Sequence, residues 1–248
     1  MKSLNLFLAV FLLQLNFFYL KAQNSFDSPY TLTYKFDAPL ATAGVGLNLA
    51  YFLLDRKSEA LQPAFISTLD RSNINAFDRS AAYNWSRPAA KGSDVLMIGA
   101  MAAPSLLFFD KNIRNDYYKI GTIWAQTMAL NTGVTNLTKV LVKRTRPYAY
   151  NPNAPEHYKL ERDARYSFFS GHTSVTASMS FMTAKIFSDY NPSSKALPYV
   201  WTTAAVVPAT VAFLRWRAGK HYASDVIVGY LTGAAIGFLV PHLHKIIR

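Results

Sequence analysis

The sequence contains no cysteine and few acidic residues. Of its 248 residues, 14 are Asp or Glu and 26 are Lys or Arg. Without cysteine, disulfide bonds, thiolate nucleophiles and cysteine-ligated metal sites are excluded, so histidine, carboxylates and hydroxyls remain for any chemistry. The formal net charge of +12 indicates an anionic partner, and nucleic acid, anionic lipid and a phosphorylated substrate are the candidates.

Apolar residues are abundant, at 51% of the chain, which is enough for one domain with a sizeable core. Strand-like alternation is confined to Tyr30–Phe36. We therefore expect an all-α fold, a bundle of about five to six helices, with long connections at Asp55–Asp94 and Arg144–Arg165. The uncharged stretches long enough for a helix are Ala38–Leu54, Val95–Phe109, Ile120–Thr138, Tyr166–Ala184, Ala196–Leu214 and Val226–His244.

The N-terminus has the features of a secretory signal. Lys2 precedes the apolar stretch Leu4–Leu20, and Lys21–Gln23 offers a small-residue cleavage region. We predict a signal peptide over residues 1–23, with an uncleaved anchor as the alternative, because roughly 17 to 25 residues span a bilayer. Residues 24–94 then form an N-terminal helical and loop region, and residues 95–248 form the core.

Signals for membrane embedding are mixed. The mean hydropathy is only +0.07, and Gln126 interrupts one apolar stretch. In favour of a membrane, Tyr199, Trp201 and Trp216 bracket the fifth stretch as an aromatic belt would, and Pro208 inside it is tolerated in packed membrane helices. We favour a membrane-embedded bundle.

Two cations end the third apolar stretch. Lys139 and Arg146 are seven residues apart, so on a continuous helix they project from one face before Pro147 turns the chain. Such a pair could grip one anion. Taken alone, the pair is more typical of a basic patch, formed together with Lys143 and Arg144, that faces solvent or anionic lipid.

A second set begins the fourth stretch. Ser170 can cap a helix, Gly171 permits close backbone approach, and free amides at a helix N-terminus bind phosphate. His172 would lie at that anion site. Without other evidence, His172 would be read as a hydrogen-bonded capping or core residue.

A third set lies between the fifth and sixth stretches. His221 and Asp225 are four residues apart and would be neighbours on a helix surface, with Arg215 shortly before them. A carboxylate that accepts from one ring nitrogen leaves the other available as a nucleophile. A solvated ion pair is the alternative.

Antiparallel helices would bring these sets together, since Lys139, His172, Arg215 and Asp225 all lie near helix ends that would meet at one end of the bundle. Such convergence is unusual for random surface charge and typical of a phosphate pocket. The active site is therefore expected at one end of the bundle.

The order and spacing of the three sets, Lys139 to Arg146-Pro147, Ser170-Gly171-His172, and Arg215 to His221 and Asp225, resemble the type 2 phosphatidic acid phosphatase and vanadium haloperoxidase superfamily. The likeness runs from about Ile120 to Val240. Phe169 and Leu214 depart from it, because Pro and Ser are usual there; these departures put the level of activity in doubt rather than the reaction class.

The resemblance implies a role for each residue. His221 would attack phosphorus and form a phosphohistidine, Asp225 would orient it, and His172 would protonate the leaving oxygen and then activate water. The phosphate would be bound by Lys139, Arg146, Ser170, Gly171 and Arg215. No metal and no cofactor are expected.

The function expected from the resemblance is hydrolysis of a phosphate or pyrophosphate group on a lipid such as phosphatidic acid, undecaprenyl pyrophosphate or lipid A. The partners are then the phosphorylated lipid and membrane lipids, with no nucleic acid and no obligate protein partner. The alternatives are a soluble periplasmic acid phosphatase, a vanadate-dependent haloperoxidase and a non-catalytic envelope protein that binds lipid phosphate.

The expected location is the bacterial inner membrane, with the site facing the periplasm, or the periplasm itself for a soluble enzyme. With a cleaved signal, six spans would place the Lys139 end in the cytoplasm, whereas five spans would place it outside. The positive-inside rule does not decide, because the basic residues at the site are needed for phosphate.

Overall fold

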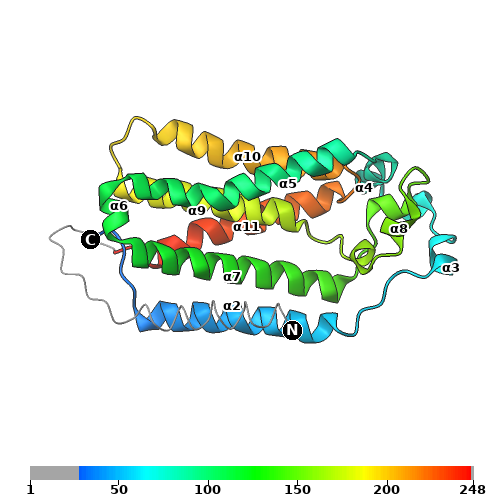
Figure 1. Cartoon of the computed structure of the whole chain (residues 1–248), viewed down its shortest axis with the longest axis horizontal. Coiled ribbons are helices and arrows are strands. Elements are labelled where there is room, and N and C mark those ends of the chain that lie inside the picture. Colours follow the sequence, from blue (N-terminus) through cyan, green and yellow to red (C-terminus); the bar gives the residue numbers. More distant parts are fainter. Residues whose placement is uncertain (1–27, 247–248) are drawn as a thin grey trace.

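The computed structural model describes residues 28–246, so the predicted signal over residues 1–23 lies outside the described residues. Within that range the chain is helical, as expected (Figure 1). The long helices are α2 (Tyr34–Asp55), α5 (Arg87–Ala102), α7 (Tyr117–Val142), α9 (Gly171–Tyr190), α10 (Leu197–Arg217) and α11 (Ala223–Leu243). Each corresponds to one of the six apolar stretches, which confirms the all-α prediction.

The strand-like alternation at Tyr30–Phe36 does not produce a strand. Helix α2 already begins at Tyr34, and Tyr30 forms only an isolated antiparallel bridge with Lys245. The Thr31 amide donates to the His244 carbonyl at 2.9 Å, which ties the start of the described chain to its end.

Helix α7 ends earlier than the Lys139–Arg146 spacing suggested. Its last residue is Val142, and Lys143 then adopts a left-handed conformation with φ of 51°. Arg146 has extended backbone, because the following Pro147 disfavours the helical region for it. Lys139 and Arg146 therefore do not share one helix face, as the continuous-helix expectation had it, although both reach the same site.

Helix α9 lies at the centre of the bundle. It contacts α5, α7, α10 and α11, while α2 packs against the outer side of α7 (Figure 1). Contact with α11 is close because Gly229, Gly233 and Gly237 face the carbonyls of Ser170, Ser174 and Ser178 in turn. This stripe of glycines at four-residue spacing lets the two backbones approach each other.

Within residues 28–246, four helices are long and apolar enough to cross a membrane: α2, α5 with its continuation η4 (Ala103–Phe109), α10 and α11. Large apolar side chains such as Ile98, Phe213 and Leu231 are exposed on them. Exposed apolar faces of this kind are typical of lipid contact. Helices α7 and α9 instead bury polar groups such as Gln126, Asn131 and Ser174 inside the bundle.

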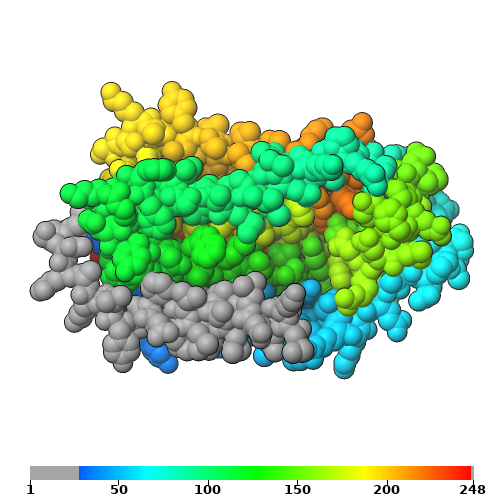
Figure 2. Space-filling model, in the orientation of Figure 1, coloured from blue at the N-terminus to red at the C-terminus, as the bar shows by residue number. Residues whose placement is uncertain are grey.

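The two long connections cover one end of the bundle, on the right in Figures 1 and 2. At that end lie the first residues of α5, α9 and α11 and the last residues of α7 and α10. The connections consist of α3 (Pro63–Ile66), η2 (Arg71–Asn73), α4 (Ala76–Arg79), η3 (Ser80–Tyr83), η5 (Pro147–Tyr150), α8 (Glu156–Lys159) and η6 (Arg162–Arg165), and α6 (Lys111–Asn115) lies before α7. The predicted boundary between the N-terminal region and the core, at residue 94, falls inside helix α5. This helix therefore joins the two regions.

Candidate active site

His221 lies in the loop between α10 and α11 and is only 1% exposed. Its Nδ1 is 2.7 Å from the Ser167 carbonyl, and its Nε2 is 3.1 Å from Nη1 of Arg146. A carbonyl only accepts and a guanidinium only donates, so these partners assign the proton to Nδ1. Nε2 therefore keeps its lone pair and faces the cations.

Electrostatics keep this imidazole neutral. Burial, reinforced by the positive charges of Arg146 and Arg215, holds the pKa of His221 well below its ordinary value. A neutral ring is the form that can act as a nucleophile.

Asp225 contacts His221 less directly than its spacing predicts. Helix α11 begins only at Ala223, so His221 precedes the helix, and the Asp225 carboxylate is 3.6 Å from Nδ1. The carboxylate instead accepts from Ser167 Oγ at 2.5 Å and from Arg144 at 2.6 Å. Asp225 thus fixes Ser167, whose carbonyl in turn holds the ring.

The three predicted cations surround His221 from different elements. Arg146 is 3% exposed and is held by Asp163 at 2.7 Å and by the Lys220 carbonyl at 3.0 Å. Arg215 is 6% exposed, and its Nε has no hydrogen-bond partner among the described residues. Both guanidiniums are buried, so an anion between them would be strongly attracted.

Lys139 reaches the site from the last turn of α7. A Cβ at position 171 would lie 3.2 Å from its Nζ, so Gly171 leaves room for the ammonium group beside the start of α9. Ser170 caps α9 by accepting from the Thr173 amide, and its own amide donates to the Asp225 carbonyl. The N-terminus of α9, where free amides favour an anion, therefore lies between Lys139 and α11.

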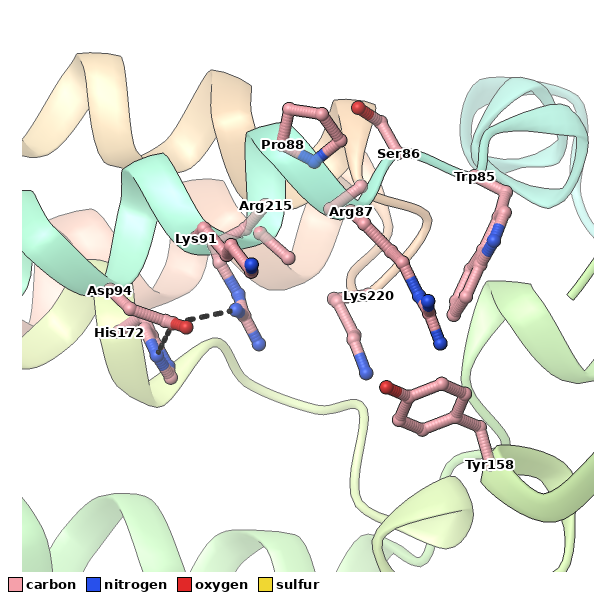
Figure 3. A pocket seen from close by; sticks show the side chains of 12 residues that line it. Trp85, Ser86, Arg87, Pro88, Lys91, Asp94, Tyr158, His172, Arg215 and Lys220 are labelled. Carbon is pink, nitrogen blue, oxygen red and sulfur yellow. Dashed lines mark hydrogen bonds and ion pairs between the residues drawn. The ribbon is translucent and has the colours of Figure 1, made fainter. Parts of the chain in front are cut away.

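The α5 residue Asp94 links two of the predicted residues, although the sequence analysis did not select it. Its carboxylate accepts from Nε2 of His172 at 2.8 Å and lies 3.4 Å from Nη1 of Arg215 (Figure 3). Arg87, Lys91 and Asp94 are spaced as residues that share one helix face. Together with the capping Ser86, that spacing is the signal that could have placed α5 at the site.

The other missed residues lie in the connections. Asp78 accepts from Arg144 at 2.7 Å and from the Ser224 amide at 2.9 Å, which anchors the start of α11. Arg144, which looked like part of a basic patch, is thereby an ion-pair partner of both Asp78 and Asp225.

A cavity of about 570 Å³ opens beside these residues. His172 and Arg215 line it directly (Figure 3). His221 is buried and is not among the lining residues. The remaining lining residues come mainly from η3–α5 and the loop before His221, and include Trp85, Arg87, Lys91, Tyr158 and Lys220. Cations exceed carboxylates around the cavity, as in a site for an anionic group.

The fold and the site together define an α-helical bundle with membrane-length helices and a cation-rich cavity at one end, beside a buried histidine. In keeping with this, residues 120–247 match the PAP2 superfamily model, and the chain belongs to that superfamily. This confirms the family suggested by the sequence motifs.

Among curated proteins, the chain is similar to a lipid A 4'-phosphatase from Porphyromonas gingivalis. The two are 27% identical over 163 residues, which is 64% of this chain and 64% of that protein. No solved structure matches the chain.

Proposed function

We propose that this protein is a bacterial membrane phosphatase that removes a phosphate group from a phosphorylated lipid through a phosphohistidine on His221. The observation that carries the proposal is the placement of Nε2 of His221 among Lys139, Arg146 and Arg215, unprotonated and with its lone pair directed at Nη1 of Arg146. Membership of the superfamily and the likeness to a lipid A 4'-phosphatase support it.

In the proposed reaction, Nε2 of His221 attacks phosphorus while the bond to the lipid oxygen breaks. His172 protonates that oxygen, and the three cations with Ser170 and the Gly171 amide neutralise the phosphoryl oxygens. His172 then takes a proton from water, which cleaves the P–N bond and releases orthophosphate. Asp225 holds the ring in place through Ser167.

A lipid substrate is favoured by a second cavity. An apolar groove of about 780 Å³ lies between α5, α9 and α10, farther along the helices that carry Asp94, His172 and Arg215. Asp94 lines the polar cavity and the next residue, Val95, lines the groove. A phosphate in the first cavity would therefore have acyl chains directed along the second.

The test measures specificity constants in mixed micelles for one phosphorylated headgroup with increasing chain length, and for a soluble aryl phosphate, with chelator present. We expect the constant to rise with chain length, since each buried methylene is worth about 0.8 kcal/mol. Activity should persist in chelator and be inhibited by vanadate.

A matched pair of variants tests whether the acyl chain of the lipid binds in the apolar groove. Gly99 lines the groove and Gly121 does not, and a Cβ at either position meets no atom within 4 Å. Gly99→Leu should flatten the dependence on chain length, whereas Gly121→Leu should not. Preference for the aryl phosphate would instead indicate a broad-specificity acid phosphatase, and a strict need for magnesium would contradict the mechanism.

The site is proposed to face the periplasm. Reporter fusions after Arg248 locate the end of α11, which lies at the end of the bundle opposite the site (Figure 1). A periplasmic site requires a cytoplasmic C-terminus if α11 crosses the membrane once, so an active periplasmic reporter would contradict this orientation.

A further inference from the structure

The polar cavity has more cations than one phosphate group needs. The inner set, Lys139, Arg146 and Arg215, surrounds His221. An outer set, Arg87, Lys91 and Lys220, lines the cavity mouth and has no counterpart in the motif that placed the inner set. The cavity volume of about 570 Å³ is in the range that holds a whole headgroup rather than a single anion.

The outer cations have no carboxylate partners. Over residues 28–246, none of the three forms an ion pair, whereas Arg144, Arg146 and Lys245 all do. Asp94 is the single carboxylate among the residues that line the cavity, and it is already engaged by His172 and Arg215. Positive charge at the mouth is therefore not neutralised by an ion pair within the described chain, although Asp163 and Glu161 act on Lys220 from farther away.

Lys220 is fixed in place by aromatic rings. Its Nζ lies 4.6 Å from the ring centre of Tyr158, 4.7 Å from Tyr148 and 5.7 Å from Trp85. Such cation–π contacts hold an ammonium group without cancelling its charge. The pKa of Lys220 is lowered to about 8 by burial and then by the nearby Arg146 and Arg215, so the group is charged at neutral pH.

Arg87 approaches the same space from the opposite wall. Ser86 caps α5 and Pro88 occupies its first turn, so the helix starts at the cavity and projects Arg87 toward Lys220 and Tyr158 (Figure 3). Lys91 follows one turn later on the same face. The outer cations thus face a common volume beside Arg215.

We propose that Arg87, Lys91 and Lys220 form a second anion subsite, which holds another phosphate group of the same lipid headgroup next to the phosphate that is cleaved. The proposal rests on the proposed function and names its substrate class: lipids that carry two phosphates. The second phosphate is either the inner phosphate of a diphosphate or a separate monoester on the headgroup.

Two substrate pairs test this and distinguish the two sources. One pair is a polyprenyl diphosphate and the monophosphate of the same chain; the other is a glycolipid with two phosphates and its singly phosphorylated form. For each pair we divide kcat/KM for the lipid with two phosphates by kcat/KM for the lipid with one. We compare this ratio in the wild type, Arg87→Gln/Lys91→Gln and Lys195→Gln. Lys195 is an exposed lysine just before α10, at the opposite end of the bundle.

The double variant should lower the ratio about tenfold or more for at least one pair, as expected for losing charge-assisted hydrogen bonds. Hydrolysis of the monophosphates should stay within about twofold, and Lys195→Gln should change neither quantity. An equal loss on both members of each pair, or no loss on either, would overturn the subsite. Wild-type protein that hydrolyses no lipid would contradict the proposed function instead.

A binding measurement is independent of turnover. On the His221→Ala background, inorganic diphosphate should raise the thermal midpoint more than orthophosphate does, and Arg87→Gln/Lys91→Gln should remove that difference. If diphosphate and orthophosphate stabilise the His221→Ala protein equally while its outer cations are intact, the subsite is also overturned.

Discussion

At His221, burial and charge act in the same direction on the pKa. The ring is enclosed, and the guanidinium groups of Arg146 and Arg215 oppose a further positive charge. The protonated form is therefore disfavoured in the folded protein, and His221 stays neutral as the pH falls through the ordinary histidine range.

This makes a measurable prediction for the free protein. Histidine NMR in detergent, assigned by comparison with His221→Ala, should show His221 titrating well below pH 6.5. Because its folded pKa lies below its unfolded value, the stability that the neutral ring contributes is present above pH 6.5 and is lost as the pH falls toward the folded pKa. A titration at or above pH 6.5 would contradict the arrangement of cations described here.

Asp94 gives a second prediction at this scale. Asp94→Asn should lower kcat about tenfold, because His172 loses the carboxylate that orients it. The same change should tighten inhibition by orthophosphate or vanadate, because a negative charge beside Arg215 is removed. A merely structural residue would weaken both catalysis and anion binding, so weaker inhibition would refute this role.

Some of the site residues could be identified from the sequence, and others could not. The motif residues could be found because each set is local: Ser170, Gly171 and His172 are consecutive, and His221 and Asp225 are four residues apart. Asp94 contacts His172 across 78 positions, and no periodicity in either segment encodes that contact. The Ser167 carbonyl, which orients His221, is a backbone group and has no side-chain signature.

Among the elements, the contact between α9 and α11 fixes the site most directly. It places Ser170 against Gly229 and lets the Ser170 amide donate to the Asp225 carbonyl. The sequence predicted both helices from their apolar stretches. It did not predict the contact, because a glycine stripe in an apolar helix is also typical of a contact between two copies of a chain.

Gly233→Ala tests this contact. The new Cβ would lie 2.1 Å from the Ser174 carbonyl oxygen, so the helices must separate, at a cost of about 1–3 kcal/mol. We expect a lower thermal midpoint in detergent and weaker vanadate binding. Gly99→Ala is the control, since a Cβ there meets nothing within 4 Å, and it should keep both properties. Wild-type stability in Gly233→Ala would show that the contact is not tight.

At the scale of the whole molecule, the apolar outer surface and the polar interior come from different helices. Helices α2, α5, α10 and α11 present apolar surface, while α7 and α9 carry polar side chains into the interior. The sequence predicted this all-α bundle with its site at one end, because the polar sets interrupt apolar stretches only near their ends. The sequence did not predict any contact between the N-terminal connection and the core. Asp78 and Asp94 make such contacts.

The proposed mechanism depends most on His221 as the nucleophile, and trapping of the phosphoenzyme tests this role directly. Wild-type protein is mixed with a lipid substrate carrying radiolabelled phosphate, quenched within one turnover and digested. We predict label that is acid-labile and base-stable, attached to the peptide containing His221 and missing from folded His221→Ala, which has no turnover. No labelled enzyme in the wild type, together with substantial activity in His221→Ala, would contradict the account.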